Sequence, residues 1–160
     1  MKFLAIDPGN KESAYCLYLP EEAEVSDRLG YAGKIENEVM LDICLKGAMG
    51  ADLVVVEMIA CMGMAVGATV FDTVFWSGRF VQAAQLPFEL VYRREEKLHI
   101  CGNPRAKDTN IRQALLDKFG EKGTKKNPGP LYHFKADMFA ALAVAVTFAE
   151  TRMKHENVLA

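Results

Sequence analysis

Two short runs of apolar residues in this chain each end in a carboxylate. Residues 3–6 lead into Asp7 and a Pro-Gly turn, and residues 53–56 lead into Glu57. Continuous apolar runs of this length predict strands that are buried on both faces. A predicted helix and a short connection precede the second run, which is typical of a crossover between parallel strands. We therefore expect Asp7 and Glu57 to lie side by side, at the sheet edge where α/β proteins bind ligands.

The remaining pattern predicts further strands and helices in a single α/β domain. We expect strands at residues 13–19, 30–35 and 88–92, and helices at residues 37–49, 68–85, 108–119 and 134–153. The turn at residues 9–12 is typical of a hairpin, and residues 98–101 are expected to form a short extended piece. A length of 160 residues favours one domain, over residues 1–160, with a single core.

The helix expected at residues 68–85 is apolar around much of its circumference. Its large side chains include Phe71, Val74, Phe75 and Trp76. A surface helix needs only one apolar stripe, so this helix either is deeply buried or uses its second face in a dimer. We favour a homodimer interface, because a small domain has little core in which to bury two faces.

Composition and cysteine usage favour a cytoplasmic protein. The chain is 51% hydrophobic and 25% charged, as is ordinary for globular domains. Its apolar runs fall short of the roughly 18 residues that a membrane span needs, and its N-terminus lacks a signal-peptide pattern. The four cysteines are far apart and form no CxxC pair, which argues against a zinc site and against a disulfide scaffold.

Charge is segregated along the chain. Residues 1–60 contain 5 basic and 11 acidic side chains, whereas residues 91–126 contain 10 basic and 5 acidic ones. This distribution indicates a basic surface for a polyanion, although a solvated lysine-rich loop and helix face would give the same pattern. The candidate phosphate contacts are Arg93, Arg94, Lys97, Arg105, Lys107, Lys122, Lys125 and Lys126.

A third carboxylate, Asp137, lies in the first turn of the last predicted helix. Together with Asp7 and Glu57 it offers hard oxygen ligands with no cluster of Cys or His nearby, which suits Mg²⁺ or Mn²⁺. Such a set can support hydrolysis of a phosphodiester by two metal ions. Each acid also has a structural alternative: Asp7 could cap a turn, Glu57 could pair with a basic residue, and Asp137 could favour the helix dipole.

The order of these elements, with acids on the first strand, the fourth strand and the last helix, resembles the RNase H-like nuclease superfamily. Within it, the chain resembles the RuvC-type Holliday junction resolvases, in the form found in phages. The stretches that match are Ala5-Ile6-Asp7-Pro8-Gly9, Val54-Val55-Val56-Glu57, Ala106-Lys107-Asp108-Thr109-Asn110-Ile111, and Ala136-Asp137 followed by Ala141-Leu142-Ala143-Val144-Ala145. The resemblance implies a mixed five-stranded sheet, with the first three strands antiparallel, flanked by helices.

The resemblance also implies roles for individual residues. Asp7, Glu57 and Asp137 match the catalytic acids that bind the metal ions, and Lys107 matches a basic residue that contacts DNA. Residues 58–67 match a loop that reaches into the junction, and the helix at 68–85 matches the dimer helix. The expected location is the cytoplasm of a bacterium or of a phage-infected host.

The family's fourth metal ligand has no clear counterpart. It falls on Ala140 if Asp137 matches the first acid of the last helix. If Asp137 is the second acid, the partner lies one turn earlier, where His133 is a candidate ligand or proton-transfer group. His133 could equally be a solvated or capping side chain, and Lys135 in the same turn could neutralise a phosphate.

The function predicted is a Mg²⁺-dependent (or Mn²⁺-dependent) homodimeric endodeoxyribonuclease that resolves Holliday junctions and other branched DNA. Junctions would be recognised by shape, with Met62, Met64 and Val66 wedged between unstacked bases or, alternatively, packed in the core. The alternatives are a flap or RNA–DNA hybrid nuclease, and a non-catalytic junction-binding protein. An actin-like ATPase is disfavoured, because the chain is too short for two such domains.

Overall fold

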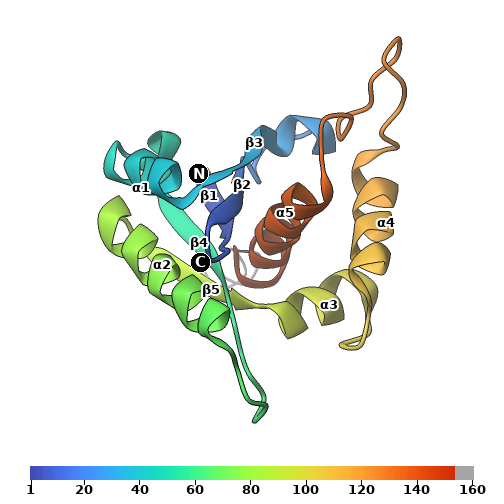
Figure 1. Cartoon of the computed structure of the whole chain (residues 1–160). Coiled ribbons are helices and arrows are strands. Elements are labelled where there is room, and N and C mark those ends of the chain that lie inside the picture. Colours follow the sequence, from blue (N-terminus) through green and yellow to red (C-terminus); the bar gives the residue numbers. More distant parts are fainter. Residues whose placement is uncertain (154–160) are drawn as a thin grey trace.

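The computed structural model, which describes residues 1–153, contains a mixed five-stranded sheet with the strand order β3-β2-β1-β4-β5 (Figure 1). Neighbouring strands β1, β2 and β3 are antiparallel, whereas β4 pairs parallel to both β1 and β5. The strands are β1 (Phe3–Asp7), β2 (Glu12–Tyr18), β3 (Leu29–Glu36), β4 (Leu53–Met58) and β5 (Phe88–Tyr92). This arrangement confirms the predicted fold class and the parallel crossover between β1 and β4.

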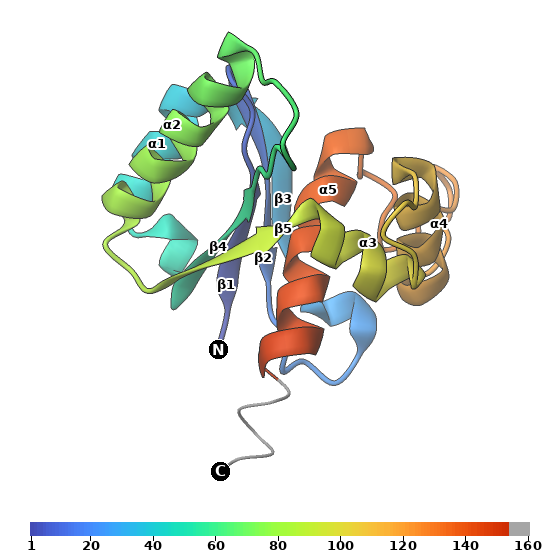
Figure 2. The ribbon, with the colours of Figure 1, turned by 90° about the horizontal axis from the view of Figure 1, so that it is seen from below.

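Helices cover both faces of the sheet, as Figure 2 shows. One face carries α1 and α2, and the other carries α5 with α3 and α4 beside it. The helices are α1 (Asn37–Leu45), α2 (Ala68–Ala84), α3 (Arg93–Cys101), α4 (Asp108–Phe119) and α5 (Ala136–Phe148). Of the helices in residues 1–153, none is both long and apolar enough to cross a membrane.

Strand β1 lies at the centre of the core, because alternate side chains serve the two helical layers. Phe3 and Ala5 pack towards α5, whereas Leu4 and Ile6 pack towards α1 and α2. The Phe3 ring meets the ring of Phe148 edge to face, with 5.1 Å between centroids. Both layers therefore fix the strand that presents Asp7, as its uninterrupted apolar run predicts.

Residues 98–101 are helical, so the prediction of an extended piece there was wrong. Helix α3 begins at Arg93, directly after β5, and ends at Gly102, whose φ of +65° is favourable for glycine. The side chain of Glu95 accepts a hydrogen bond from the backbone N–H of Tyr92 (3.0 Å), which caps the first turn. Because α3 is amphipathic and short, its pattern of charges obscures the helical period.

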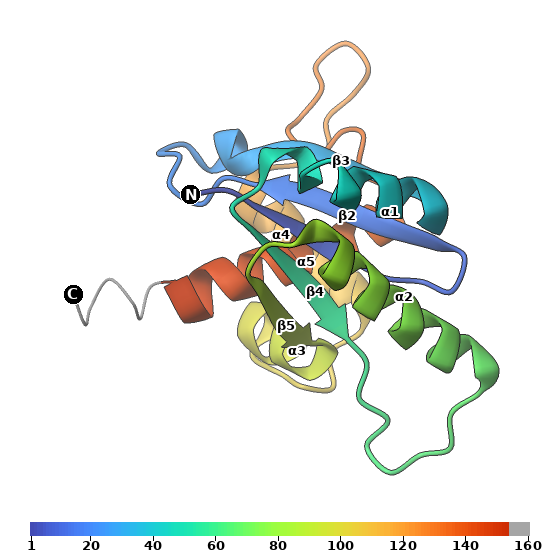
Figure 3. The ribbon, with the colours of Figure 1, turned by 90° about the vertical axis from the view of Figure 1, so that its left-hand side faces the viewer.

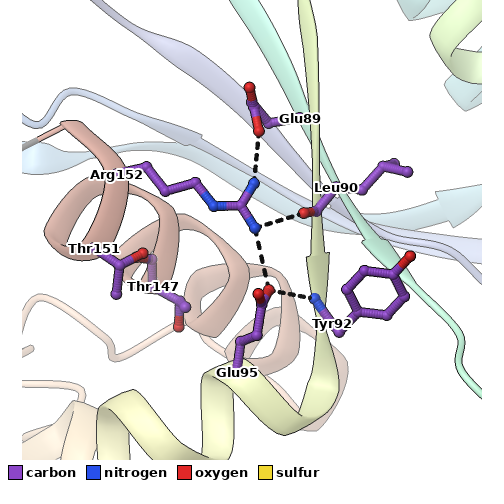
Figure 4. A network of polar contacts seen from close by, with 7 residues as sticks. All are labelled: Glu89, Leu90, Tyr92, Glu95, Thr147, Thr151 and Arg152. Carbon is purple, nitrogen blue, oxygen red and sulfur yellow. Dashed lines mark hydrogen bonds and ion pairs between the residues drawn. The ribbon is translucent and has the colours of Figure 1, made fainter. Parts of the chain in front are cut away.

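An ion-pair network anchors the start of α3 to the end of the last helix (Figure 4). Helix α5 ends at Phe148 and continues as a wider helical turn, Ala149–Met153, rather than as the regular helix predicted to residue 153. From this turn the Arg152 guanidinium donates to Glu89 Oε2 (2.6 Å), the Leu90 carbonyl (2.8 Å) and Glu95 Oε2 (3.2 Å). These contacts hold β5 and α3 in place behind the site described below.

Two loops project from opposite ends of the molecule (Figures 1 and 3). One comprises residues 59–67 and follows β4; the other comprises residues 120–135 and joins α4 to α5. The second loop is closed by a bridge between Gly123 and Pro128 and by the Thr124 N–H, which donates to the Asn127 carbonyl (3.0 Å).

Candidate active site

The structure brings the three predicted carboxylates to one cavity of about 350 Å³. Asp7 ends β1, and Glu57 lies near the end of β4. The residues just before them, Ile6 and Val56, pair directly in the parallel register, so the two acids lie on adjacent strands at the same level of the sheet. Asp137 reaches the same cavity from the first turn of α5. The convergence follows from the topology, since the carboxyl ends of β1 and β4 and the amino end of α5 lie at one end of the sheet (Figure 2).

Burial, together with a neighbouring carboxylate, raises the pKa of both Asp7 and Glu57. The pKa of Asp7 is raised to about 8, first by burial and then by the charge of Glu57 and a hydrogen bond to it. The pKa of Glu57 is raised to about 7 by burial and by Glu96, while Arg93 opposes the shift. Glu57 Oε2 is buried and has no hydrogen-bond partner. An unsatisfied carboxylate oxygen beside a second acid is a favourable environment for a cation.

Asp137 differs from the other two acids because a lysine already neutralises it. Lys34 Nζ lies 2.7 Å from Asp137 Oδ2 and 3.4 Å from Glu12 Oε2. Lys34 lies on β3 opposite Ala14 of β2, and Ala14 in turn lies opposite Asp7 of β1. This register of three strands places the lysine near the acids. A sequence pattern does not reveal this contact, because it depends on the register of three strands.

Arg93 is the cation at the centre of the site. Its Nη1 lies 2.7 Å from Glu96 Oε2 and 3.7 Å from Glu57 Oε2, and its Nη2 lies 2.7 Å from Asp108 Oδ1. Sequence reasoning placed Arg93 among residues that contact DNA phosphates; in this structure it is paired with carboxylates. Arg93 lies at this position because α3 begins immediately after β5, and the end of β5 pairs with the end of β4 that carries Glu57.

Glu96 was missed as a candidate residue. Its side chain is completely buried, it accepts a hydrogen bond from Arg93, and its Oε1 has no hydrogen-bond partner. Burial raises its pKa to about 8 against the opposing effect of Arg93. The signal that could have found it is helical spacing, since Arg93 and Glu96 are three residues apart, but this requires α3 to be recognised as a helix.

Three further residues line the cavity beside the acids. Asp108 begins α4, Arg112 follows one turn later and lies over the Phe139 ring (5.2 Å), and Ala140 faces the cavity from α5. Ala140 lies one turn beyond Asp137, where the family resemblance implies another acid. A methyl group there supplies no ligand.

The structure does not bring His133 to the carboxylates. His133 is exposed and lines a different cavity, formed with the end of the loop around Pro130 and with Gly30 and Tyr31 of β3. Its ring packs edge to face on Tyr132, with 4.9 Å between centroids. A role for His133 at the carboxylates stays a prediction, since the residue lies at a separate cavity beside β3 in this structure.

A second cavity, of about 470 Å³, brings together five of the predicted DNA-binding residues. These residues are Met62, Met64, Arg94, Lys97 and Arg105. Tyr92 also lines this cavity, and Arg93 lines both cavities and so forms part of the wall between them. Met62 and Met64 are exposed, which excludes the alternative that they pack in the core of this chain.

The other predicted DNA contacts lie outside both cavities. Lys107 is exposed directly before α4, next to Asp108. Lys125 and Lys126 are exposed near the tip of the loop at residues 120–135. Lys122 donates instead to the Phe134 carbonyl (2.7 Å), so it helps to close that loop.

Helix α2 presents an exposed apolar face. Phe71 and Phe75 are 65% and 69% exposed, although both are large aromatic residues. They are one helical turn apart, and Val74 beside them is also exposed. The opposite face of α2 is buried, with Phe80 at the sheet, as the pattern around the whole helix predicts.

The carboxylate oxygens at this cavity suit a hard cation, although the side chains do not form a closed ring of ligands. Within residues 1–153, no three His, Cys, Asp or Glu side chains stand in a ready-made metal cage. Asp7 and Glu57 nevertheless offer adjacent carboxylates, one with an unsatisfied buried oxygen. A divalent ion between them would satisfy that oxygen and remove their repulsion.

Comparison with known proteins shows similarity at the level of structure. No protein-family model and no curated sequence matches the chain. The structure of Thermus thermophilus RuvC matches with a TM-score of 0.67 at 16% identity, over 94% of this chain and 96% of that one. The T. thermophilus RuvC in complex with a Holliday junction substrate matches with a TM-score of 0.70 at 16% identity, over 96% of both chains.

A viral protein shares the same architecture. The fowlpox virus Holliday junction resolvase matches with a TM-score of 0.56 at 12% identity, over 94% of this chain and 99% of that one. These matches span nearly the whole length of both partners, so they concern the complete sheet and its helices rather than a shared fragment. The chain therefore has the RNase H-like fold of the RuvC-type Holliday junction resolvases.

Proposed function

We propose that this protein is a nuclease that resolves Holliday junctions by metal-dependent hydrolysis of phosphodiester bonds. The observation that carries the proposal is the convergence of Asp7, Glu57 and Asp137 at one cavity. These acids come from two strands and a helix that are distant in sequence. The fold on which they converge is that of a protein solved with a Holliday junction substrate.

In this proposal Asp7 and Glu57 hold Mg²⁺, for which Mn²⁺ can substitute. The ion supplies Lewis acidity to the phosphate and lowers the pKa of a bound water. In the net reaction a water oxygen forms a bond to phosphorus, the bond from phosphorus to the sugar oxygen breaks, and that oxygen leaves with a proton. Lys34 engages Oδ2 of Asp137, and in this proposal Oδ1 of the half-exposed side chain (51%) orients water.

The second cavity is proposed to receive DNA next to the scissile phosphate. Arg94, Lys97 and Arg105 supply positive charge there, which gives affinity and register without reading sequence. Met62 and Met64 lie beside them on the loop that follows β4, where flexible apolar side chains can fill the space between unstacked bases. Lys107, Lys125 and Lys126 would extend the phosphate contacts.

Paired cleavage of a junction needs two sites, and we assign the exposed face of α2 to a homodimer. Phe71, Val74 and Phe75 would be covered by the same residues of a second copy, as in an isologous two-fold interface. Burial of two exposed aromatic side chains on each partner is the main contribution expected from this face.

A panel of DNA substrates tests the proposed function. Purified protein should cleave a four-way junction in Mg²⁺ or Mn²⁺, and it should cleave flaps, RNA–DNA hybrids and linear duplexes much less. Asp7→Asn should bind the junction but cleave it at least 10²-fold more slowly. A preference for flaps or hybrids would assign another nuclease activity, and equal behaviour of the wild type and Asp7→Asn, independent of metal, would identify a non-catalytic junction-binding protein.

A further inference from the structure

We propose that the active site takes one divalent cation, and that the Arg93 guanidinium supplies the second positive charge. This inference rests on the proposed function and revises the expectation of two ions. It makes Arg93 a catalytic residue that contacts the scissile phosphate, rather than a general contact to the DNA backbone.

The position of Arg93 is the first argument. One guanidinium nitrogen, Nη1, lies 3.7 Å from Glu57 Oε2 and 2.7 Å from Glu96 Oε2, so Arg93 already places a positive charge beside these carboxylates. The same side chain lines the cavity that holds Asp7 and Asp137. Its long stem is largely covered, since the side chain is only 27% exposed. Arg93 is therefore a fixed part of the cavity.

The charge of the cavity is the second argument. Its lining contains four carboxylates, Asp7, Glu57, Asp108 and Asp137, and two guanidinium groups, Arg93 and Arg112, so two negative charges remain. Around the lining, Glu96 lies behind Arg93, and Lys34 lies between Asp137 and Glu12. One divalent ion balances the charge of the lining residues, whereas a second would leave the lining with two excess positive charges before the DNA phosphate arrives.

The ligands available are the third argument. A second ion needs further oxygen ligands, but Ala140 supplies none. The other two carboxylates of the lining are already paired with cations, Asp137 with Lys34 and Asp108 with Arg93, each at 2.7 Å. By contrast, Arg93 is fixed by a hydrogen bond, which its guanidinium donates to the fully buried carboxylate of Glu96. Among residues 1–153, the lining thus leaves no unpaired carboxylate for a second ion beyond Asp7 and Glu57, and a buried acid fixes an arginine beside them.

Arg93 can also reach a substrate. Its Nη2 is bound by Asp108, whose side chain is 79% exposed and free to rotate into solvent. A DNA phosphate that displaces Asp108 would receive a charged N–H donor next to the ion held by Asp7 and Glu57. Arginine N–H groups stabilise the charge that develops on a transferring phosphoryl group, which is the task of the second ion in two-ion hydrolysis.

The experiment counts bound ions and does not depend on cleavage. Mn²⁺ is titrated into the metal-free protein, and free Mn²⁺ is followed by electron paramagnetic resonance, for the wild type, Arg93→Met, Arg93→Lys and Asp7→Asn. We expect one ion per chain in the wild type and loss of that ion in Asp7→Asn. Arg93→Met should bind Mn²⁺ about tenfold more tightly, because a cation has left the site, and yet cleave about 10²-fold more slowly.

Controls separate this inference from folding and from the proposed function. Arg94→Met, which removes the neighbouring cation from the other cavity, should leave Mn²⁺ binding unchanged. Arg93→Lys, which keeps the charge, should bind Mn²⁺ like the wild type and so exclude loss of structure. Two ions per wild-type chain with normal cleavage would overturn the inference alone, as would weaker Mn²⁺ binding in Arg93→Met. No bound ion and no metal-dependent cleavage would overturn the proposed function as well.

Discussion

Asp7 and Glu57 lie where the ionised form of a carboxyl group is unfavourable when no cation is bound. Burial raises the pKa of both carboxyl groups, and their proximity adds to the shift for Asp7. A charged pair in this position costs free energy until a cation joins it. The local cost is consistent with a site that is organised for binding rather than for stability.

The stability of the metal-free protein should therefore depend on pH through Asp7. Its pKa is about 8 in the folded state, above the ordinary aspartate value of 3.8, so the unfolded chain releases the proton at lower pH. The stability contributed by the protonated group is present at pH 4 and falls as the pH rises to 8. We expect the melting temperature in EDTA to decrease over this interval, and Asp7→Asn to show a flatter profile and a higher melting temperature near pH 8. Identical profiles for the two proteins would refute the assignment.

Asp108 should compete with DNA for Arg93. Its exposed carboxylate lies 2.7 Å from the guanidinium, at the mouth of the cavity. Asp108→Asn is expected to bind a four-way junction about threefold more tightly in Ca²⁺, by fluorescence anisotropy, with a larger gain at low salt. Asp117→Asn, on the same helix and hydrogen-bonded to Gln113, is the control. Unchanged or weaker binding by Asp108→Asn would contradict this role.

Individual residues were predictable where a local pattern carries the information. Asp7 and Glu57 were found because each ends an apolar run, and Asp137 because it starts a helix. Lys34 and Glu96 were not found, because their roles arise from strand register and from a short helix whose charges obscure the helical period. Contacts between elements distant in sequence leave no mark in a local window.

At the scale of elements, the junction of β5 and α3 determines how the site is supported. Arg93 follows β5 without an intervening loop, so any movement of α3 moves the guanidinium. The Arg152 network holds this junction from behind (Figure 4). The sequence predicted β5 but not α3, and the anchoring turn at Ala149–Met153 was expected to be regular helix.

Removal of the anchor should loosen α3 without removing any group from the cavity. Arg152→Met loses ion pairs that are partly exposed and a hydrogen bond to the partly buried Leu90 carbonyl of β5, so we expect a melting temperature lower by about 2–4 °C. Hydrogen exchange of the α3 amides should rise. Lys46→Met, which breaks an exposed pair on α1, should change neither quantity. Exchange in α3 that remains at wild-type levels would show that Arg152 does not anchor it.

At the scale of the whole molecule, the matches to RuvC structures span nearly the whole chain. The hairpin and the parallel pairing of β1 with β4 were predictable from the apolar runs and the turn between them, and the antiparallel arrangement of the first three strands from the family resemblance. The order of the strands, with β5 beside β4 at the edge, was not predicted. The face of α2 was also identified from its pattern, but its partner is not visible in a single chain. The two projecting loops are placed far apart (Figure 3), so under the proposed function one chain would contact DNA over a broad surface.

Self-association is testable through α2. Phe75→Asp places a charge on the exposed apolar face, and we expect it to convert a dimer into a monomer by light scattering coupled to size exclusion. Asp72→Asn, at an exposed polar position of the same helix, should remain dimeric. A monomeric wild type, or a dimer that persists in Phe75→Asp, would remove α2 as the interface.

The central claim is that Asp7 and Glu57 act as one metal-dependent site, and a double-mutant cycle on cleavage tests it most directly. Single-turnover rates on a four-way junction in saturating Mg²⁺ would be compared for the wild type, Asp7→Asn, Glu57→Gln and the double variant. We predict a loss of at least about 10²-fold in each single variant and no further loss in the double variant, because residues that act as a unit are not additive. Losses that multiply, or a single variant that cleaves at the wild-type rate, would contradict the account.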